Sequence, residues 1–462
     1  MRTIPIDKVV NEATITPFHR LVLVLCGVLM IVDGYDMISY GSVVARLMLE
    51  WELTSVQAGW LGSVALFGML IGGMFIAPLA DKFGRRPVML ACLAASAVAS
   101  LGCALSTGFL SLAIFRTLVG ISLGAMVPNF IALVGEYAPK RSKAFLICMV
   151  CSLYSAGGIA AGLLAIVLIP NFGWRSVFFV SAAAVVLVPL MFKLLPESPE
   201  FLARQPHRRQ EFEAIVARIA PGIDTTRVVS VVRETVPKAP IAEIFRHGNT
   251  VNTVLIWIVF ATTMLLSYGL NTWLPTLMTT AGYPLGSGLF NLVILNVGGL
   301  FGAMFAGWLS DRFGIKKIIL CYFLLATVSL TCLGFNPSAL VLNILLVIAG
   351  ATTIGTLSVV HALAAEYYPS LVRSTGIGWA AGVGRIGAMS GPILGGALLG
   401  LALPFQQNFL IVALPGLLGV LAIACVKMSR SASASDPQAV GASESLSDEI
   451  ATSTDVIGRS AG

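Results

Sequence analysis

The chain has 462 residues, of which 57% are hydrophobic and only 11% carry a formal charge. Soluble domains carry about 25% charged residues, so this composition excludes a soluble globular protein and indicates a polytopic membrane protein. The net charge of +7 does not indicate a nucleic-acid partner, because most Lys and Arg residues lie in alternate loops and in the two tails. That bias predicts a multi-pass protein with both termini in the cytoplasm.

Twelve apolar segments are long enough to cross a bilayer, which takes about twenty residues in a helix. They are expected at residues 20–42, 57–79, 87–107, 110–136, 144–168, 174–193, 250–273, 288–310, 317–334, 338–362, 374–400 and 404–427. An all-α membrane fold is therefore predicted. Its expected parts are a six-helix bundle over residues 1–193, a cytoplasmic loop over 194–249, a second bundle over 250–428 and a disordered tail over 429–462. Residues 210–219 of the loop have the pattern of a short amphipathic helix.

The first apolar segment contains two acidic residues, Asp33 and Asp36. Residues three apart lie on nearly the same face of a helix, and Asp33 lies about 18 Å along a span that begins at Leu21. An Asp at the membrane centre costs about 2.5 to 3.5 kcal/mol, so both side chains are expected to face other helices or water and to exchange protons. We interpret them as the proton-coupling residues. The alternative is a polar patch near the outer end of the helix.

Two arginines also fall inside apolar segments. Arg385 is expected about 16 Å into the eleventh span, where its planar guanidinium suits a carboxylate. The simplest partner is the carboxylate of a substrate, and the alternative is a structural pair with an Asp of the first span. Arg116 is expected about 9 Å into the fourth span, at a depth near that of Asp36. It can pair with Asp36 or extend to the outer surface.

The chain repeats itself at an offset of 230 residues. Residues 79–84, which read LADKFG, recur as LSDRFG at 309–314, and Glu136-Tyr137 recurs as Glu366-Tyr367. Two parallel six-helix repeats are therefore predicted, with a substrate cavity between them near the midplane. The ionisable residues are not repeated, because Asp33 corresponds to Thr263 and Arg385 to Ser155. The acids thus lie in one half and the midplane Arg in the other.

Residues 79–86, which read LADKFGRR, resemble the loop signature of the major facilitator superfamily, although Ala77 stands where a Gly is usual. Residues 33–36, which read DGYD, resemble the signature of the aromatic acid:proton symporter family within it. Residues 196–199, which read PESP, are shared with sugar and organic-ion porters and discriminate little. The resemblance spans residues 18–428. It implies a monomeric transporter rather than an enzyme, importing a benzoate or hydroxybenzoate type of acid with protons by alternating access, with the bilayer as its other partner.

Polar residues at the cytoplasmic ends of the spans are predicted to form the gates. Asp81 and Asp311 follow spans two and eight, where a carboxylate can accept backbone N–H groups at the start of a neighbouring helix. Glu136 is expected to pair with Arg85 or Arg86, and Glu366 with Lys316. The resemblance implies a gating role for the set Asp81, Arg85, Arg86, Glu136, Asp311, Glu366 and Arg373. The alternative is ordinary loop anchoring.

An aromatic substrate needs an apolar wall with a few polar groups. The candidates are Arg385, Arg116, Tyr154, Ser155, Asn271, Trp273, Asn296 and Trp379, together with Tyr268 and Asn291. Aromatic residues in membrane helices more often pack or lie at the interface, and the glycines of spans five and eleven are interpreted as close-packing positions. The four histidines, His19, His207, His247 and His361, are expected in tails, loops or at a helix end, away from any proton path.

No nucleotide-binding loop, metal-ligand cluster or catalytic triad is recognisable in the sequence, so neither a cofactor nor a metal is expected. Two other functions remain open. The first is a carrier for another organic acid, a sugar or a drug. The second is a transporter-like sensor, which the 56-residue central loop disfavours because it is too short for an evident output domain.

Overall fold

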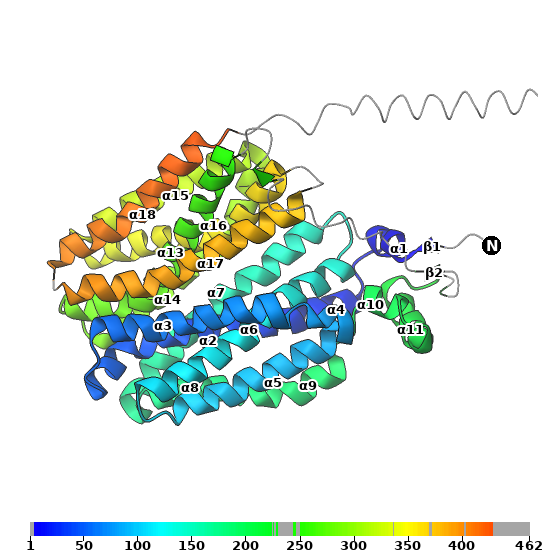
Figure 1. The fold of residues 1–462 in the computed structure, drawn as a ribbon, viewed down its shortest axis with the longest axis horizontal. Coiled ribbons are helices and arrows are strands. Elements are labelled where there is room, and N and C mark those ends of the chain that lie inside the picture. Colours follow the sequence, from blue (N-terminus) through cyan, green and yellow to red (C-terminus); the bar gives the residue numbers. More distant parts are fainter. Residues whose placement is uncertain are drawn as a thin grey trace, which may run out of the picture.

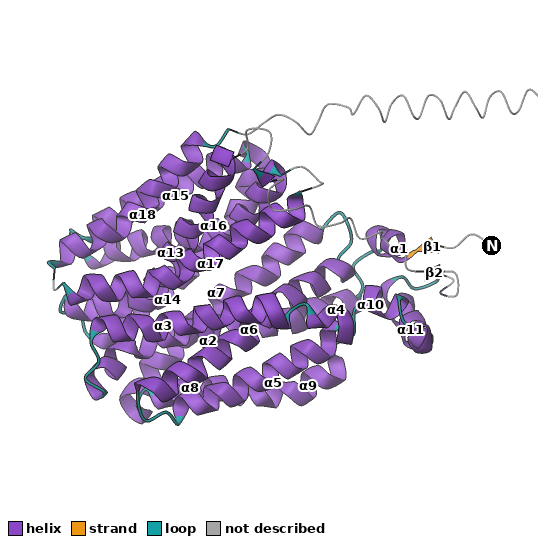
Figure 2. Ribbon diagram, in the orientation of Figure 1, coloured by secondary structure: helices purple, strands orange, loops and turns teal. Residues whose placement is uncertain are grey.

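The structure is a computed structural model that describes residues 4–223, 225, 228–229, 244–245, 250–335, 337–368, 372–401 and 403–427. Long helices make up almost all of this part of the chain (Figures 1 and 2). Two short strands, β1 (Ile4–Pro5) and β2 (Val228–Val229), pair in parallel. The predicted disordered tail lies outside the described residues.

The first half contains five long helices and a broken sixth. They are α2 (Pro17–Glu50), α3 (Ser55–Ile71, continued as a π-helix over Gly72–Ile76), α5 (Arg85–Ala104), α6 (Phe109–Tyr137), α7 (Lys143–Phe172), and α8 (Arg175–Ala182) joined through a 3-10 turn to α9 (Leu187–Leu194). Four short helices lie at one end: α1 (Ile6–Glu12), α4 (Leu79–Phe83), α10 (Pro199–Ala203) and α11 (Arg209–Ile219). The amphipathic helix predicted at 210–219 is α11.

The described part of the second half contains six long helices. They are α13 (Thr250–Thr280), α14 (Leu285–Phe313), α15 (Ile315–Leu333), α16 (Ala339–Tyr367), α17 (Arg373–Gly400) and α18 (Phe405–Cys425). Within the described residues, eleven spans are long and apolar enough to cross a membrane. The twelfth, α17, is rich in glycine and contains Arg385, yet its 28 residues span about 42 Å, more than the hydrocarbon thickness. The predicted all-α fold of twelve membrane helices is confirmed.

The largest difference from the predicted boundaries is at the outer ends of two helices. Helices α2 and α13 continue to Glu50 and Thr280, eight and seven residues past the predicted ends at 42 and 273. The residues there are mostly apolar, with a few polar ones such as Arg46 and Glu50, and form further helical turns instead of loops. Asp33 therefore lies at the middle of α2.

The packing of the helices repeats between the halves (Figure 1). Helix α2 packs on α7 and α3 on α6, while α13 packs on α17 and α14 on α16. The offset of 230 residues relates the first two pairs to the second two. The halves meet where α7 contacts α14 and α3 contacts α17, and these two contacts are related by the same repeat. The two predicted six-helix repeats are thus present in the structure.

Glycines allow α2 to approach its neighbours on both sides of the acidic pair. A Cβ atom at Gly34 would lie 2.0 Å from the carbonyl oxygen of Tyr154 on α7. A Cβ atom at Gly41 would lie 2.0 Å from the carbonyl oxygen of Asn271 on α13. Any larger residue would separate the helices, because these neighbours are backbone atoms. The close-packing interpretation also holds in α17, where a Cβ at Gly387 would lie 2.1 Å from the carbonyl oxygen of Ala261.

Several close contacts between the halves lie at the end of the molecule opposite α10 and α11. The Ser63 hydroxyl donates a hydrogen bond of 2.6 Å to the Met389 carbonyl. A Cβ atom at Gly59 would lie 2.6 Å from the Pro392 carbonyl oxygen, and one at Gly396 would lie 2.3 Å from that of Ser55. We call this set of contacts between α3 and α17 the outer contact.

The first prediction concerns the approach of α2 to α7. Gly34→Ala should lower the thermal unfolding midpoint of the purified protein in detergent, because overpacking a well-packed site costs about 1–3 kcal/mol. Gly307→Ala in α14 is the matched control, since a Cβ there meets nothing within 4 Å. Equal midpoints for the two variants would contradict the packing described here.

Candidate functional site

Charged side chains from the two halves meet at mid-helix. Asp33 lies at the middle of α2 and is only 1% exposed. Arg385 lies near the middle of α17 in the other half and interacts electrostatically with Asp33. Its Nη1 atom lies 3.6 Å from the sulfur of Met69 on α3. Arg385 therefore faces the first half across the boundary between the halves.

Two tyrosines complete this centre. The hydroxyl groups of Tyr154 on α7 and Tyr268 on α13 lie close enough to interact. Tyr154 also interacts electrostatically with both Asp33 and Arg385. We call Asp33, Arg385, Tyr154 and Tyr268 the central cluster. Each half contributes two helices to it, α2 and α7 from the first and α13 and α17 from the second.

The charged groups of the central cluster are not satisfied by each other. Among the described residues, no carboxylate oxygen lies within the 4.0 Å of an ion pair from the Arg385 guanidinium. Asp33 Oδ1 is buried and has no hydrogen-bond partner there. Buried charges are costly unless paired and hydrogen-bonded. The arrangement can accommodate an anion at Arg385 and a proton at Asp33. A direct ion pair between Arg385 and an Asp of the first span, which was the alternative from the sequence, is not formed among the described residues.

Asp36 and Arg116 form a second polar group inside the first half. Arg116 is 1% exposed, so the alternative that its side chain extends to the surface is wrong. Its Nη1 donates a hydrogen bond of 2.9 Å to the backbone carbonyl of Asp36, and its guanidinium lies 5.2 Å above the Tyr40 ring. The Asp36 carboxylate accepts a bond of 3.5 Å from Ser100 on α5. The expected contact between the two residues is present, but it is made through the main chain.

Other predicted substrate residues lie in helix packing. Asn296 Nδ2 donates to Asn271 Oδ1 at 2.9 Å, which ties α14 to α13. The Trp273 indole N–H donates to the Pro392 carbonyl at 2.8 Å, which ties α13 to α17. Trp379 is 46% exposed and stacks on Trp257 with ring centroids 6.1 Å apart. No described contact joins these residues to Arg385. The remaining two candidates are buried, on α7 and α14 respectively: Ser155 and Asn291.

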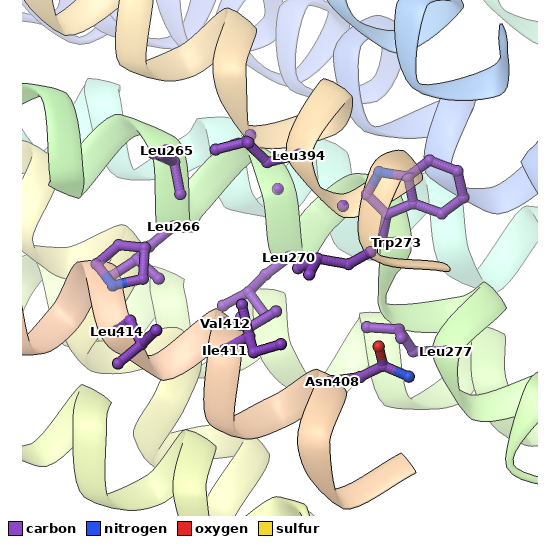
Figure 3. Close-up of a pocket in the computed structure, with 15 residues that line it drawn as sticks. Leu265, Leu266, Leu270, Trp273, Leu277, Leu394, Asn408, Ile411, Val412 and Leu414 are labelled. Carbon is purple, nitrogen blue, oxygen red and sulfur yellow. The ribbon is translucent and has the colours of Figure 1, made fainter. Parts of the chain in front are cut away.

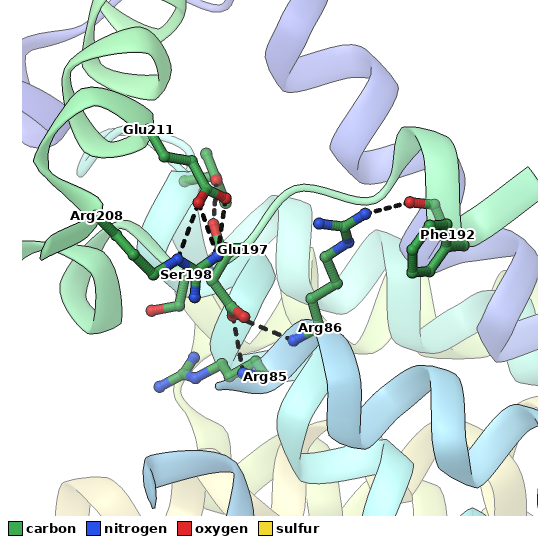
Figure 4. Close-up of polar contacts among 8 residues, drawn as sticks. Arg85, Arg86, Phe192, Glu197, Ser198, Arg208 and Glu211 are labelled. Carbon is green, nitrogen blue, oxygen red and sulfur yellow. Dashed lines mark hydrogen bonds and ion pairs between the residues drawn. The ribbon is translucent and has the colours of Figure 1, made fainter. Parts of the chain in front are cut away.

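Polar residues around the start of α5 form a group of hydrogen bonds and ion pairs in the first half (Figure 4). Arg85 Nη2 lies 2.6 Å from Glu136 Oε1, which confirms the predicted pair. Glu197, only 1% exposed, accepts the backbone N–H groups of Arg85 at 2.8 Å and Arg86 at 3.1 Å. Gly84 permits this approach, since it has a φ of 100° and a Cβ there would lie 2.4 Å from Glu197 Oε2.

Glu197 thus accepts the backbone N–H groups at the start of a neighbouring helix, which is the role that the sequence predicted for Asp81. Asp81 is exposed, and no hydrogen bond to its carboxylate is found among the described residues. A carboxylate at the start of α5 is favoured by the helix dipole and by the N–H groups that lack partners inside the helix. The signal was the PESP sequence at 196–199, whose acidic residue follows the sixth span directly.

No equivalent ion pair is present among the described residues of the second half. Lys316 donates to the carbonyls of Ala424 at 3.0 Å and Val426 at 2.7 Å, so its predicted pairing with Glu366 is wrong. Lys316 corresponds to Arg86, which likewise donates to a carbonyl at the end of its own sixth span, that of Phe192 (Figure 4). Arg85, which pairs with Glu136 in the first half, corresponds to Ile315 in the second half. The second half therefore has no basic side chain at this position that could pair with Glu366.

The other predicted gating residues of the second half are exposed. Asp311 and Glu366 both lie at the surface of the described protein. Arg373 donates through Nε to the Tyr368 carbonyl at 3.2 Å, which caps the end of α16. These contacts are those of helix termini, and a gating role for these residues stays a prediction.

His361 is a residue that the sequence interpretation placed away from the site. Its ring packs edge-on against Phe260 with centroids 5.1 Å apart, and it interacts electrostatically with Arg385. It lies on α16, near the end that also carries Arg373 at the start of α17. Nothing in its sequence context distinguishes it from a histidine at a helix end.

Comparison with known proteins gives the family. The family model described as Major Facilitator Superfamily matches residues 25–304 and 290–454. The chain belongs to the major facilitator superfamily. This facilitator is therefore a transporter and not an enzyme, and it is a multi-pass membrane protein.

Its relatives include three transporters of aromatic acids. A benzoate transport protein of Acinetobacter baylyi is 37% identical and is aligned over 91% of this chain and 92% of its own. The 4-hydroxybenzoate transporter PcaK of the same organism is 34% identical, over 90% of this chain and 93% of its own. A gallate transporter of Pseudomonas putida is 32% identical over the same shares of the two chains, 90% and 93%.

The fold also matches solved structures of transporters. The inward open xylose transporter XylE of E. coli has a TM-score of 0.70 at 18% identity, and the match covers 89% of this facilitator and 97% of that chain. A bacterial homologue of the human lysosomal transporter Spinster has a TM-score of 0.65 at 18% identity, with 89% and 96% covered. At this identity the likeness concerns the fold alone.

The second prediction concerns the cap on α5 of this facilitator. Glu197→Gln should lower the thermal unfolding midpoint, because the weaker amide acceptor replaces a buried carboxylate and leaves backbone donors poorly satisfied, at a cost of about 1–3 kcal/mol. Asp81→Asn is the control at the end of the neighbouring short helix and should leave the midpoint nearly unchanged. The reverse order of the two midpoints would show that Asp81 is the structural acceptor.

Proposed function

We propose that this facilitator imports an aromatic monocarboxylate, of the benzoate or hydroxybenzoate type, together with protons by alternating access. The observation that carries the proposal is the position of Arg385. Its guanidinium lies at mid-helix at the boundary between the halves, faces Asp33, and has no carboxylate within ion-pair distance among the described residues. The proposed setting is a bacterial inner membrane, with both termini in the cytoplasm and one chain as the working unit.

The nature of the cargo is supported by chemistry and by the relatives. A guanidinium binds a carboxylate through two parallel hydrogen bonds, so Arg385 suits a substrate with one carboxylate. The relatives named above are transporters of benzoate, 4-hydroxybenzoate and gallate. These three compounds share an aromatic ring that bears one carboxylate. Tyr154 and Tyr268 offer ring faces and hydroxyl groups beside Arg385.

Proton coupling follows from competition for one cation. When Asp33 is ionised, its negative charge and that of a bound substrate both interact with Arg385. A proton taken up by Asp33 removes the repulsion between the two carboxylates and leaves the guanidinium to the substrate. One accompanying proton also cancels the charge of the substrate, which otherwise enters an inside-negative cell against about 2.3 kcal/mol per 100 mV. Asp36, three residues further along α2, is the second candidate for a proton.

Alternating access is supported by where the halves touch. The outer contact between α3 and α17 lies at the end that the distribution of Lys and Arg places outside the cell. The Arg85–Glu136 pair lies at the opposite end, inside the first half alone. This combination supports a state in which the outer end is closed, and rocking of the halves about the central cluster would then expose the site to the other side.

The third prediction tests the role of Arg385. Arg385→Gln should weaken benzoate binding by at least about tenfold, because loss of a buried charge partner typically costs several kcal/mol. Isothermal titration of the purified variants measures this directly. Arg46→Gln, at an exposed residue near the outer end of α2 and remote from the central cluster, is the control and should bind as the wild type does. Unchanged binding by Arg385→Gln would overturn the assignment.

The fourth prediction separates binding from coupling. Asp33→Asn should abolish benzoate accumulation driven by a pH gradient in proteoliposomes, because the amide cannot exchange a proton. The same variant should retain exchange of labelled for unlabelled benzoate, since Arg385 remains. Wild-type accumulation should rise as the external pH falls, because protons are co-substrates. Accumulation by Asp33→Asn at the wild-type rate would rule out coupling through this residue.

The substrate class is tested in the same vesicles by competition. Benzoate and hydroxybenzoates should block uptake of labelled benzoate, whereas aliphatic monocarboxylates, sugars and cationic drugs should not. Inhibition by an aliphatic acid at equal concentration would favour a general organic-acid carrier. Binding of benzoate with no accumulation in wild-type vesicles would favour a sensor.

A further inference from the structure

A cavity of about 260 Å³ lies within the second half, between α13, α17 and α18 (Figure 3). None of the residues of the central cluster lines it. Leu394 of α17 and Leu414 of α18, both at its edge, are 49% and 56% exposed on the outside of the bundle. Since this surface faces lipid in a membrane, the cavity is open to molecules dissolved in the bilayer.

The walls of the cavity are apolar apart from one side chain. Leucine, isoleucine and valine residues from the three helices supply most of the surface, and no charged residue lines it. The exception is Asn408, near the start of α18. A cavity of about 150 Å³ in another protein holds benzene and stays free of water. This one is larger and can take a ring or chain with a few more carbon atoms.

Asn408 presents an unused hydrogen-bond acceptor to this cavity. The residue is only 6% exposed. Its Nδ2 atom donates a hydrogen bond of 3.1 Å to the Leu403 carbonyl, which fixes the orientation of the amide. Its Oδ1 atom is buried and has no hydrogen-bond partner among the described residues. In Figure 3 this oxygen points in among the apolar side chains that line the cavity.

We propose that the cavity is a binding site for a neutral phenol or alcohol that enters from the bilayer. The hydroxyl group donates a hydrogen bond to Asn408 Oδ1, and the hydrocarbon part lies among the leucines of α13 and α17. A buried acceptor without a donor is unfavourable, so a ligand with one donor is preferred over a pure hydrocarbon. An ionised carboxylate is excluded, because no cation compensates for its removal from water. The site is therefore separate from that for the proposed substrate.

The cavity also borders the outer contact. Trp273 lines it and donates its indole N–H to the Pro392 carbonyl. The same carbonyl oxygen lies 2.6 Å from where a Cβ atom of Gly59 on α3 would be. A ligand in the cavity thus touches the part of α17 that closes the outer end.

The test compares a phenol with its matched hydrocarbon on the full chain in lipid nanodiscs. An aryl diazirine that bears a phenolic hydroxyl labels the protein on illumination, and 4-propylphenol or propylbenzene competes with it. The labelled peptides should come from α13, α17 and α18. In Asn408→Leu, the affinity for 4-propylphenol relative to that for propylbenzene should fall about tenfold. Taking this ratio cancels the different partitioning of the two compounds into lipid.

Two further variants make the result decisive. Asn171→Leu makes the same change at an exposed residue outside the cavity and should leave the ratio unchanged. Val412→Phe fills the cavity and should weaken both competitors, which decides the matter if Asn408→Leu does not fold. Three outcomes would each overturn the proposal: an unchanged ratio in Asn408→Leu, labelling elsewhere, or labelling that Val412→Phe does not reduce. The first would show that the phenol hydroxyl does not bind Asn408. The assay measures binding alone, so its outcome is independent of that of the transport experiments.

Discussion

The interaction between Asp33 and Arg385 is the constraint on which the rest of the structure depends. Two opposite charges lie near the middle of membrane helices, and each belongs to a different half of the chain. They are close enough to interact but do not form a direct ion pair, which leaves each able to bind something else. Charges in such a place are retained at a free-energy cost, so their presence indicates function more strongly than any apolar contact does.

The repeated scaffold and the unrepeated chemistry have separate physical roles. Equivalent helix pairs hold each half together, and glycines such as Gly34 and Gly387 fix the distance between the helices at the level of the charged residues. Equivalent basic residues, Arg86 and Lys316, cap the last helix of each half. Among the described residues, the ion pair of Arg85 with Glu136 and the central charges have no counterpart in the other half. A symmetric frame therefore holds an asymmetric site, in which movement of one half relative to the other changes what Arg385 faces.

The sequence predicted the helices and the central charges well, because a charge inside an apolar segment is conspicuous and the width of the bilayer fixes the helix length. It predicted the partners of polar residues less well. Glu197 caps α5 instead of Asp81, Lys316 binds carbonyls instead of Glu366, and Arg116 binds a main-chain carbonyl of Asp36. Which partner a polar side chain finds depends on the rotation of each helix about its axis and on the length of the side chain. The hydrophobic periodicity of the sequence does not specify the rotation closely enough to choose between partners one or two helical turns apart. For the same reason the sequence did not predict the hydrogen bonds by which Trp273 and the pair Asn271–Asn296 join helices.

The most direct test of the central claim is to count the protons taken up when benzoate binds. Isothermal titration of the wild-type protein in buffers that differ in ionisation enthalpy gives this number. The account predicts uptake of up to one proton for each benzoate bound at a pH where Asp33 is ionised in the free protein, and none for Asp33→Asn, which should still bind benzoate through Arg385. Equal proton uptake by the wild type and by Asp33→Asn, or benzoate binding with no proton uptake in the wild type at any pH, would contradict it.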